Sequence, residues 1–157
     1  AAAARDEGGR LAGFHALDQA RFEAGIPRFP VDMDETNLPP EAGLDREAIS
    51  YSKGCYTGQE IVARMQYLGK LKRHLFHLSL PAGQPPAIGS PIFSPVHASS
   101  VGEVVLAAND GEAVELLAVL QQDAVTDGRL SLESVDGPRL GLLDLPYTLD
   151  AKREIER

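Results

Sequence analysis

The sequence is poor in the residues and patterns that several common classes of protein require. It contains one cysteine in 157 residues, which excludes an intrachain disulfide, a zinc finger and an iron–sulfur cluster held by the chain's own thiolates. Positive charge is also scarce, because 15 Lys and Arg stand against 23 Asp and Glu and the net charge is −8. A protein that coats nucleic acid needs a basic surface, so this balance argues against that class.

Long apolar runs are missing as well. The longest, such as residues 104–108, fall far short of the ~18 residues of a membrane span, and the first residues lack the pattern of a signal peptide. We therefore expect a cytoplasmic protein without contact with a membrane, for which a single thiol is also typical. The sequence lacks a phosphate-binding glycine loop, a dinucleotide fingerprint and a nucleophile elbow.

Residues 1–69 contain the pattern of two helices. Apolar residues spaced by three and four predict the buried face of a first helix: Leu11, Phe14, Leu17, Ala20 and Ala24. A second helix is predicted to follow Thr57, because Thr57 and Glu60 have the spacing of a capping box. Its predicted apolar face consists of Ile61, Met65 and Leu68.

Residues 70–157 change to the period of two that is typical of strands. The candidate strands are 75–80, 101–108, 113–120, 129–133 and 140–145. Asn109-Asp110-Gly111 predicts a hairpin turn between the second and the third. We therefore predict an α+β chain with two domains, residues 1–69 and a small antiparallel barrel or sandwich over 70–157. Because it begins without Met, we also expect it to be the later part of a longer protein.

The segment 53–60, Lys-Gly-Cys-Tyr-Thr-Gly-Gln-Glu, is the most informative one. Cys55 lies just before the second predicted helix and two residues from Lys53. A helix N-terminus and a nearby cation both favour the thiolate, which is the form that acts as nucleophile or ligand. The alternative is a buried cysteine that acts as a small apolar residue. A cysteine hydrolase would need a histidine base near the thiol. His74 and His77 lie on the next predicted strand, and nothing in the sequence indicates that they face Cys55.

Charged residues gather in two segments. Between residues 53 and 77, five Lys and Arg stand against Glu60 alone. This basic segment either attracts an anionic ligand or protects the edge of a sheet against pairing with another chain. Residues 32–36 begin like a calcium loop, but Asn37 and Gly43 stand where glycine and glutamate are required. An acidic surface loop is therefore the preferred interpretation there.

Four segments together resemble the YgfZ-type folate-binding proteins, which are relatives of the glycine-cleavage T-protein: 21–28, 31–39, 41–44 and 53–60. The pattern Lys-Gly-Cys-Tyr-x-Gly-Gln-Glu is specific to the YgfZ branch, whereas Glu-Ala-Gly and Asp-x-Asp-Glu-Thr are similar to segments of the whole superfamily. The resemblance implies the end of a folate-binding domain, with two helices and loops, followed by a small antiparallel β-barrel. It also places the family's pterin pocket upstream of residue 1.

The same resemblance implies tetrahydrofolate binding and an accessory role in assembling or repairing iron–sulfur enzymes, including those that modify tRNA. The partners expected are folate and these enzymes or their assembly proteins, without direct contact with nucleic acid. Cys55 corresponds to the family's cysteine and is the candidate reactive or contact thiol. The candidate folate residues are Arg21, Glu23, Lys53, Tyr56, Gln59 and Glu60; no metal ligand is expected. For Arg21, an ordinary surface pair with Asp18 is the alternative.

Two other function classes stay open. A T-protein-like aminomethyltransferase, which passes a one-carbon unit to tetrahydrofolate, would need an acid upstream of residue 1 and has no need of the segment 53–60. An interaction domain would use its barrel to dock on a partner enzyme.

Overall fold

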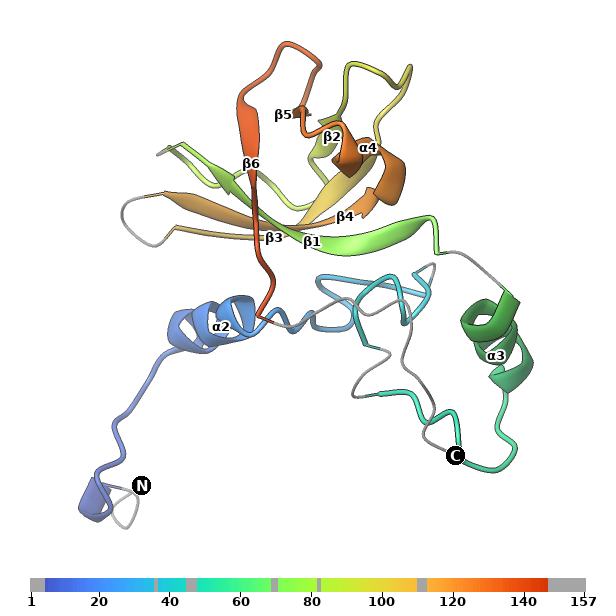
Figure 1. Ribbon diagram of the computed structural model, residues 1–157. Coiled ribbons are helices and arrows are strands. Elements are labelled where there is room, and N and C mark those ends of the chain that lie inside the picture. Colours follow the sequence, from blue (N-terminus) through green and yellow to red (C-terminus); the bar gives the residue numbers. More distant parts are fainter. Residues whose placement is uncertain are drawn as a thin grey trace.

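The computed structural model describes residues 5–35, 37–44, 48–68, 71–81, 83–109 and 113–146 (Figure 1). In this part of the chain, six strands form a closed antiparallel barrel. The strands are β1 (Arg73–Leu80), β2 (Pro91–Phe93), β3 (Gly102–Asn109), β4 (Val114–Gln121), β5 (Leu130–Leu132) and β6 (Arg139–Leu143). The helices are α2 (Phe14–Glu23), α3 (Gln59–Leu68) and α4 (Gln122–Thr126). The predicted α+β class with a small antiparallel barrel is confirmed.

The strands follow the order β1-β4-β3-β2-β5-β6 around the barrel, and β6 pairs again with β1. β3 and β4 form the predicted hairpin; the predicted turn residues Asp110 and Gly111 lie outside the described residues. All five predicted strands are present, to within a few residues at their ends. β2 and α4 were not predicted, because three and five residues are too few to show a periodicity.

Both faces of β4 are covered, which explains its continuous apolar sequence. Its even-numbered residues fill the interior of the barrel, and its odd-numbered apolar residues form a second cluster on the outside. The interior residues are Val114, Leu116, Ala118 and Leu120, and the outer residues are Leu117 and Val119. A strand that is buried on both faces does not alternate between apolar and polar residues.

A β-bulge in β3 enlarges this outer cluster. The pairing passes from Val104 with Ala118 to Leu106 with Leu117, so Val105 is the extra residue. Val104 packs inside the barrel, whereas Val105 and its neighbour Leu106 both pack in the outer cluster. An extra residue changes the phase of a strand. Two adjacent apolar side chains of β3 therefore point toward α2.

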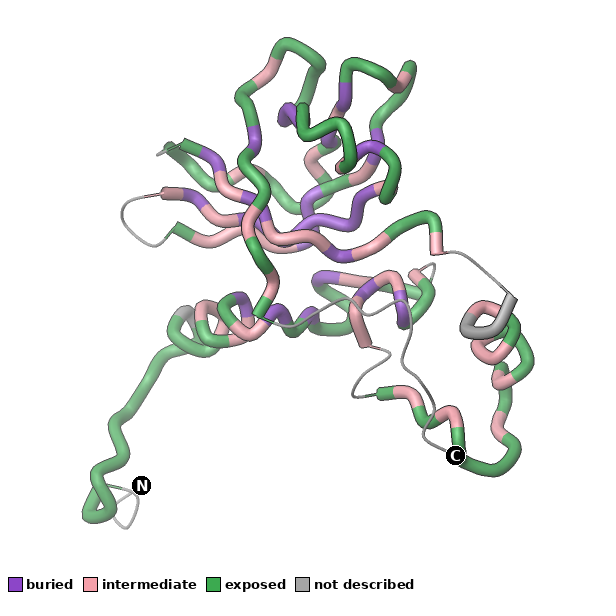
Figure 2. Tube along the Cα trace, in the orientation of Figure 1, coloured by how far each residue is buried: buried purple, intermediate pink, exposed green. Residues whose placement is uncertain are grey.

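Helix α2 packs on the outer cluster through Phe22, which is 1% exposed. Burial of such a side chain stabilises the protein by about 1.5–3 kcal/mol. The helix face predicted from the sequence is wrong, because Leu11, Phe14 and Leu17 are exposed, Phe14 to 82% (Figure 2). Their spacing identified an apolar face, but the residue that contacts the barrel lies on another side of the helix.

Helix α3 begins at Gln59 rather than directly after Thr57. The carbonyl of Gly58 accepts the first hydrogen bonds, from the backbone N–H of Ile61 at 3.1 Å and of Val62 at 3.3 Å, so Gly58 is the N-cap. The predicted capping box is therefore wrong, and Glu60 lies in the first turn. The predicted apolar face is also incorrect at Ile61, which is exposed. Among the described helices, none has the length and apolar character that crossing a bilayer requires.

Candidate functional site

Arg21 is the centre of a polar network between α2 and the segment that follows it. One guanidinium nitrogen, Nη1, donates to Asp32 Oδ2 at 2.8 Å and to the carbonyl of Ile26 at 3.1 Å. The other, Nη2, donates to Asp18 Oδ1 at 2.9 Å. The backbone N–H of Arg28 also donates to Asp32 Oδ2, at 2.7 Å. Arg21 therefore holds the start of the segment 24–35 against the helix that carries it.

Asp32 is a buried anion of this network and not part of an exposed acidic loop. It is 4% exposed, which corrects the surface position expected for it. Its second oxygen, Oδ1, is buried without a hydrogen-bond partner, and so is Nε of Arg21. Removing either partner of a buried ion pair destabilises the protein, because it leaves an uncompensated buried charge.

The environment of Arg21 keeps its guanidinium charged. Burial alone would lower the pKa of Arg21, but the hydrogen bonds and charges of Asp32 and Asp18 outweigh this and raise the pKa above its ordinary value. The pairing with Asp18 considered from the sequence is present, as one part of the network. Glu23, two residues further along α2, is exposed and accepts a hydrogen bond from Gln19 at 3.1 Å.

Gln59 braces the loop that presents Cys55. Its side-chain Nε2 donates to the carbonyl of Lys53 at 3.3 Å, and its backbone N–H donates to the carbonyl of Tyr56 at 3.2 Å. The two bonds join the start of α3 to positions on both sides of Cys55. The thiol is free and exposed, so the alternative of a buried apolar cysteine is wrong.

The left-handed conformation of Gly58 completes this loop. Its φ of +88° is one that side chains with a Cβ rarely adopt, which explains why glycine precedes Gln59. Lys53 is exposed and Tyr56 half-buried. Glu60 pairs with Arg64 at 3.1 Å on the exposed surface of α3, where such a pair contributes little to stability.

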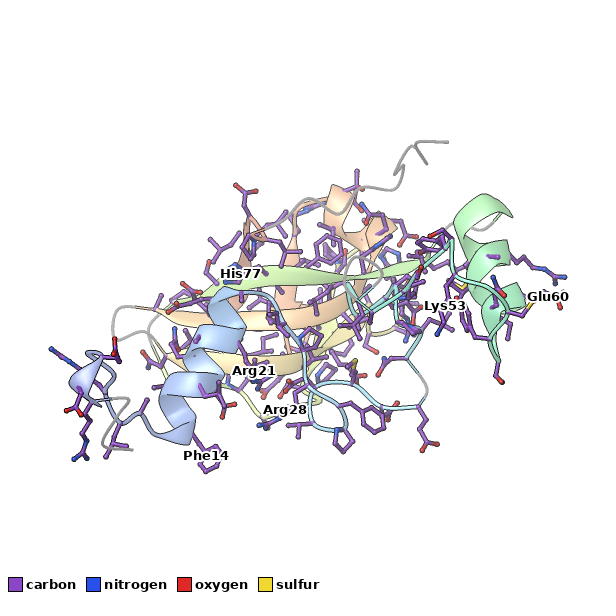
Figure 3. The ribbon with its side chains drawn as sticks, turned by 90° about the horizontal axis from the view of Figure 1, so that it is seen from below. Phe14, Arg21, Arg28, Lys53, Glu60 and His77 are labelled. Atoms are coloured by element: carbon purple, nitrogen blue, oxygen red, sulfur yellow. The ribbon has the colours of Figure 1, made fainter. Side chains whose placement is uncertain are left out.

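The predicted site residues form two groups rather than one. Arg21 lies on α2, whereas Glu60 on α3 and Lys53 beside this helix lie at the other end of the molecule (Figure 3). Figure 1 shows the same separation, with the described residues of 24–35, 37–44 and 48–58 lying between the two helices on one side of the barrel. Among the described residues, no group of three or more His, Cys, Asp or Glu is placed as metal ligands would be.

The histidines considered as bases for Cys55 lie on β1. One ring nitrogen of His77 faces Glu115 of β4 and the other faces the carbonyl of Asp144. Both nitrogens of this side chain therefore contact groups of the barrel domain rather than Cys55. Neither this group nor the role of Asp32 was predicted from the sequence. An alternating strand pattern could have placed His77 and Glu115 on outer faces, but only the strand order brings them together.

The exposed cations of the basic segment fit both interpretations. Lys72 and Arg73 are exposed at the start of β1, where an anionic ligand could reach them. The explanation as a protected sheet edge fits the first half of the strand, because β6 pairs with β1 only over residues 77–79.

Curated relatives match most of the chain. It is 36% identical over 139 residues to the tRNA-modifying protein YgfZ of Yersinia enterocolitica and 34% identical to that of Sodalis glossinidius. The resemblance to the YgfZ proteins is confirmed. Each match covers 85% of this chain and 41% of the YgfZ relative, so the chain spans less than half the length of these YgfZ proteins.

A solved structure shares the fold of this chain. The crystal structure of the glycine cleavage system aminomethyltransferase T from Bartonella henselae superposes with a TM-score of 0.70 at 19% identity. The match covers 93% of this chain and 42% of the transferase. At this identity the likeness shows a shared fold. No model of a known protein family matches the chain.

Proposed function

We propose that this chain is part of a tetrahydrofolate-binding accessory protein of the YgfZ type, which supports iron–sulfur enzymes that modify tRNA. Residues 1–69 would be the end of the folate-binding domain and residues 70–157 the barrel domain. Both would act in the cytoplasm. The chain has a single thiol and so cannot hold a cluster by its own cysteines, which suits an accessory factor.

The observation that carries this proposal is the loop 53–60. It presents Cys55 to solvent between two backbone positions that Gln59 holds. A structural cysteine is normally buried, whereas this one is exposed on a braced loop, as a thiol that meets a partner or reagent must be. The two YgfZ relatives are named for tRNA modification, which suggests the process that this loop serves.

The candidate side chains have the charges and hydrogen-bonding groups that a folate requires. A folate has a pterin edge with N–H donors and a tail that ends in carboxylates. Glu23 offers an exposed carboxylate acceptor, and Lys53 an exposed cation, which are the charge-assisted partners that such groups require. Arg21 would act indirectly, because its donors hold Asp32 and Asp18. Tetrahydrofolate, when bound, would supply a one-carbon carrier.

Titration calorimetry with tetrahydrofolate tests the folate part of the proposal. Because the resemblance places the pterin pocket upstream of residue 1, the titration uses the whole protein of which this chain is part. We expect it to bind tetrahydrofolate, Glu23→Gln to weaken binding, and Lys53→Gln to remove a preference for polyglutamate over monoglutamate forms. Absence of any binding by the whole protein would overturn this part. Equal affinity for the two forms would show that the basic segment does not meet the tail.

A genetic experiment tests the accessory role. The chain is produced in bacteria that lack their own YgfZ, and thiolated tRNA nucleosides are measured by mass spectrometry. Restoration by the unaltered chain and loss with Cys55→Ser would support the proposal, whereas equal restoration by both would show that the thiol is not used.

An aminomethyltransferase is the second candidate, favoured by the fold shared with the Bartonella henselae enzyme. A shared fold does not carry the reaction with it. Release of ammonia from an aminomethyl donor in the presence of tetrahydrofolate would favour this candidate, and it should then be unaffected by Cys55→Ser.

A further inference from the structure

His77 is the place where three separate segments meet on the outside of the barrel. Its Nε2 lies 2.8 Å from Glu115 Oε2 on β4, and its Nδ1 lies 3.1 Å from the carbonyl oxygen of Asp144, just after β6. The ring of Phe22 from α2 contacts the imidazole edge to face, with 5.3 Å between the ring centres and 77° between the planes. One side chain thus joins α2, the barrel and the segment after β6.

Both ring nitrogens of His77 face acceptors. A carbonyl oxygen and an ionised carboxylate can only accept hydrogen bonds, and a neutral imidazole has a single N–H to donate. Both contacts are hydrogen bonds only when the His77–Glu115 pair holds two protons. Two protonation states of the pair meet this condition: an imidazolium beside a carboxylate, and a neutral ring beside a carboxylic acid. The side chains are 14% and 26% exposed, so water replaces a lost bond poorly.

We propose that His77 and Glu115 form a two-proton clamp that fastens α2 and the segment after β6 to the barrel, and that the clamp opens as the pH rises. Glu115 is the charged group in contact with the ring among the described residues; α2 contributes the apolar Phe22, and the segment after β6 contributes a backbone carbonyl. The β6 residue paired with His77 is Leu143, which is also apolar.

The direction of the pH dependence follows from proton counting. The closed clamp holds one proton more than an open one in which the ring is neutral and the carboxylate ionised, so raising the pH favours the open state. Since α2 carries Arg21 and Glu23, the clamp would also regulate folate binding; this last step rests on the proposed function.

Amide hydrogen exchange of residues 14–23 tests the clamp, on the intact chain without folate. After correction for the intrinsic effect of pH, protection should fall between pH 6 and pH 8, by up to about tenfold for each pH unit, because the closed clamp holds one proton more than the open one. In His77→Phe, which keeps an aromatic ring beside Phe22, protection should be low at both pH values. His74→Phe on the same strand is the matched control and should behave as the unaltered chain.

Glu115→Gln gives the sharper comparison and keeps the shape of the pair. The amide of glutamine can donate to Nε2 while Nδ1–H donates to the Asp144 carbonyl, so the clamp should stay closed and the fall in protection should disappear. The same protection at both pH values in the unaltered chain, or an equal fall in Glu115→Gln, would overturn the clamp. Because folate is absent, either result leaves the proposed function untouched.

Discussion

Replacing Phe22 by alanine should detach α2 from the barrel. Phe22 is 1% exposed and lies among Leu75, Val105, Leu117 and Val119 on the outer faces of β1, β3 and β4. No other side chain of α2 is as deeply buried among the described residues. The variant loses the transfer energy of the ring and leaves a cavity, which together cost about 3–5 kcal/mol.

Urea unfolding followed by circular dichroism measures this loss. With a denaturant slope of about 2 kcal/mol per molar, a loss of about 4 kcal/mol lowers the midpoint by about 2 M urea. Hydrogen exchange of residues 14–23 should show the same loss locally, because the barrel interior does not contain Phe22.

Phe14→Ala is the matched control on the same helix. Phe14 is 82% exposed, so its removal should change the free energy of unfolding by no more than about 0.5 kcal/mol. Equal midpoints for the two variants would refute the packing described for α2, and so would a larger loss in Phe14→Ala than in Phe22→Ala.

Three further changes test the site and the barrel. Asp32→Asn removes the charge that faces Arg21 and should lower the free energy of unfolding by about 3 kcal/mol, whereas Glu35→Gln in the same segment should lower it little. Because the pKa of Arg21 is raised, the ion pair persists below that pKa. The difference in urea midpoint between the two variants should therefore be the same at pH 6 and pH 9. Gly102→Ala should prevent barrel closure, seen as the loss of the β-sheet signal in circular dichroism, because a Cβ would clash with the carbonyl oxygen of Val119. Iodoacetamide should alkylate Cys55 at a rate within about threefold of that in unfolded chain; strong protection would contradict its exposure.

The barrel could be predicted because its strands are local patterns. In the predicted strand 129–133, Leu130 and Leu132 alternate with polar residues and are buried, since alternation and turn residues are properties of adjacent positions. The closure of the barrel is a different matter, because β2 pairs with β5 through two residue pairs. So short a ladder leaves no signal in the sequence.

The candidate site could be predicted only in part, for a physical reason. The loop 53–60 was recognised as a motif, but the bond from Gln59 to the Lys53 carbonyl depends on the backbone path between them. Asp32 was placed at the surface with the rest of the acidic segment 32–36, because acidic residues are normally exposed. Its burial follows from Arg21, 11 positions earlier, and no short-range pattern joins the two.

The pairing of β1 with β6 has a consequence for synthesis of the chain. β1 is the first strand of the barrel to leave the ribosome and β6 the last, yet Leu78 pairs with Leu142. While residues 81–138 are being made, β4 can already add to one side of β1, but its other side remains an unpaired edge. Such an edge is where nascent chains associate wrongly. A ribosome that stalls before residue 139 would therefore release a chain prone to aggregation.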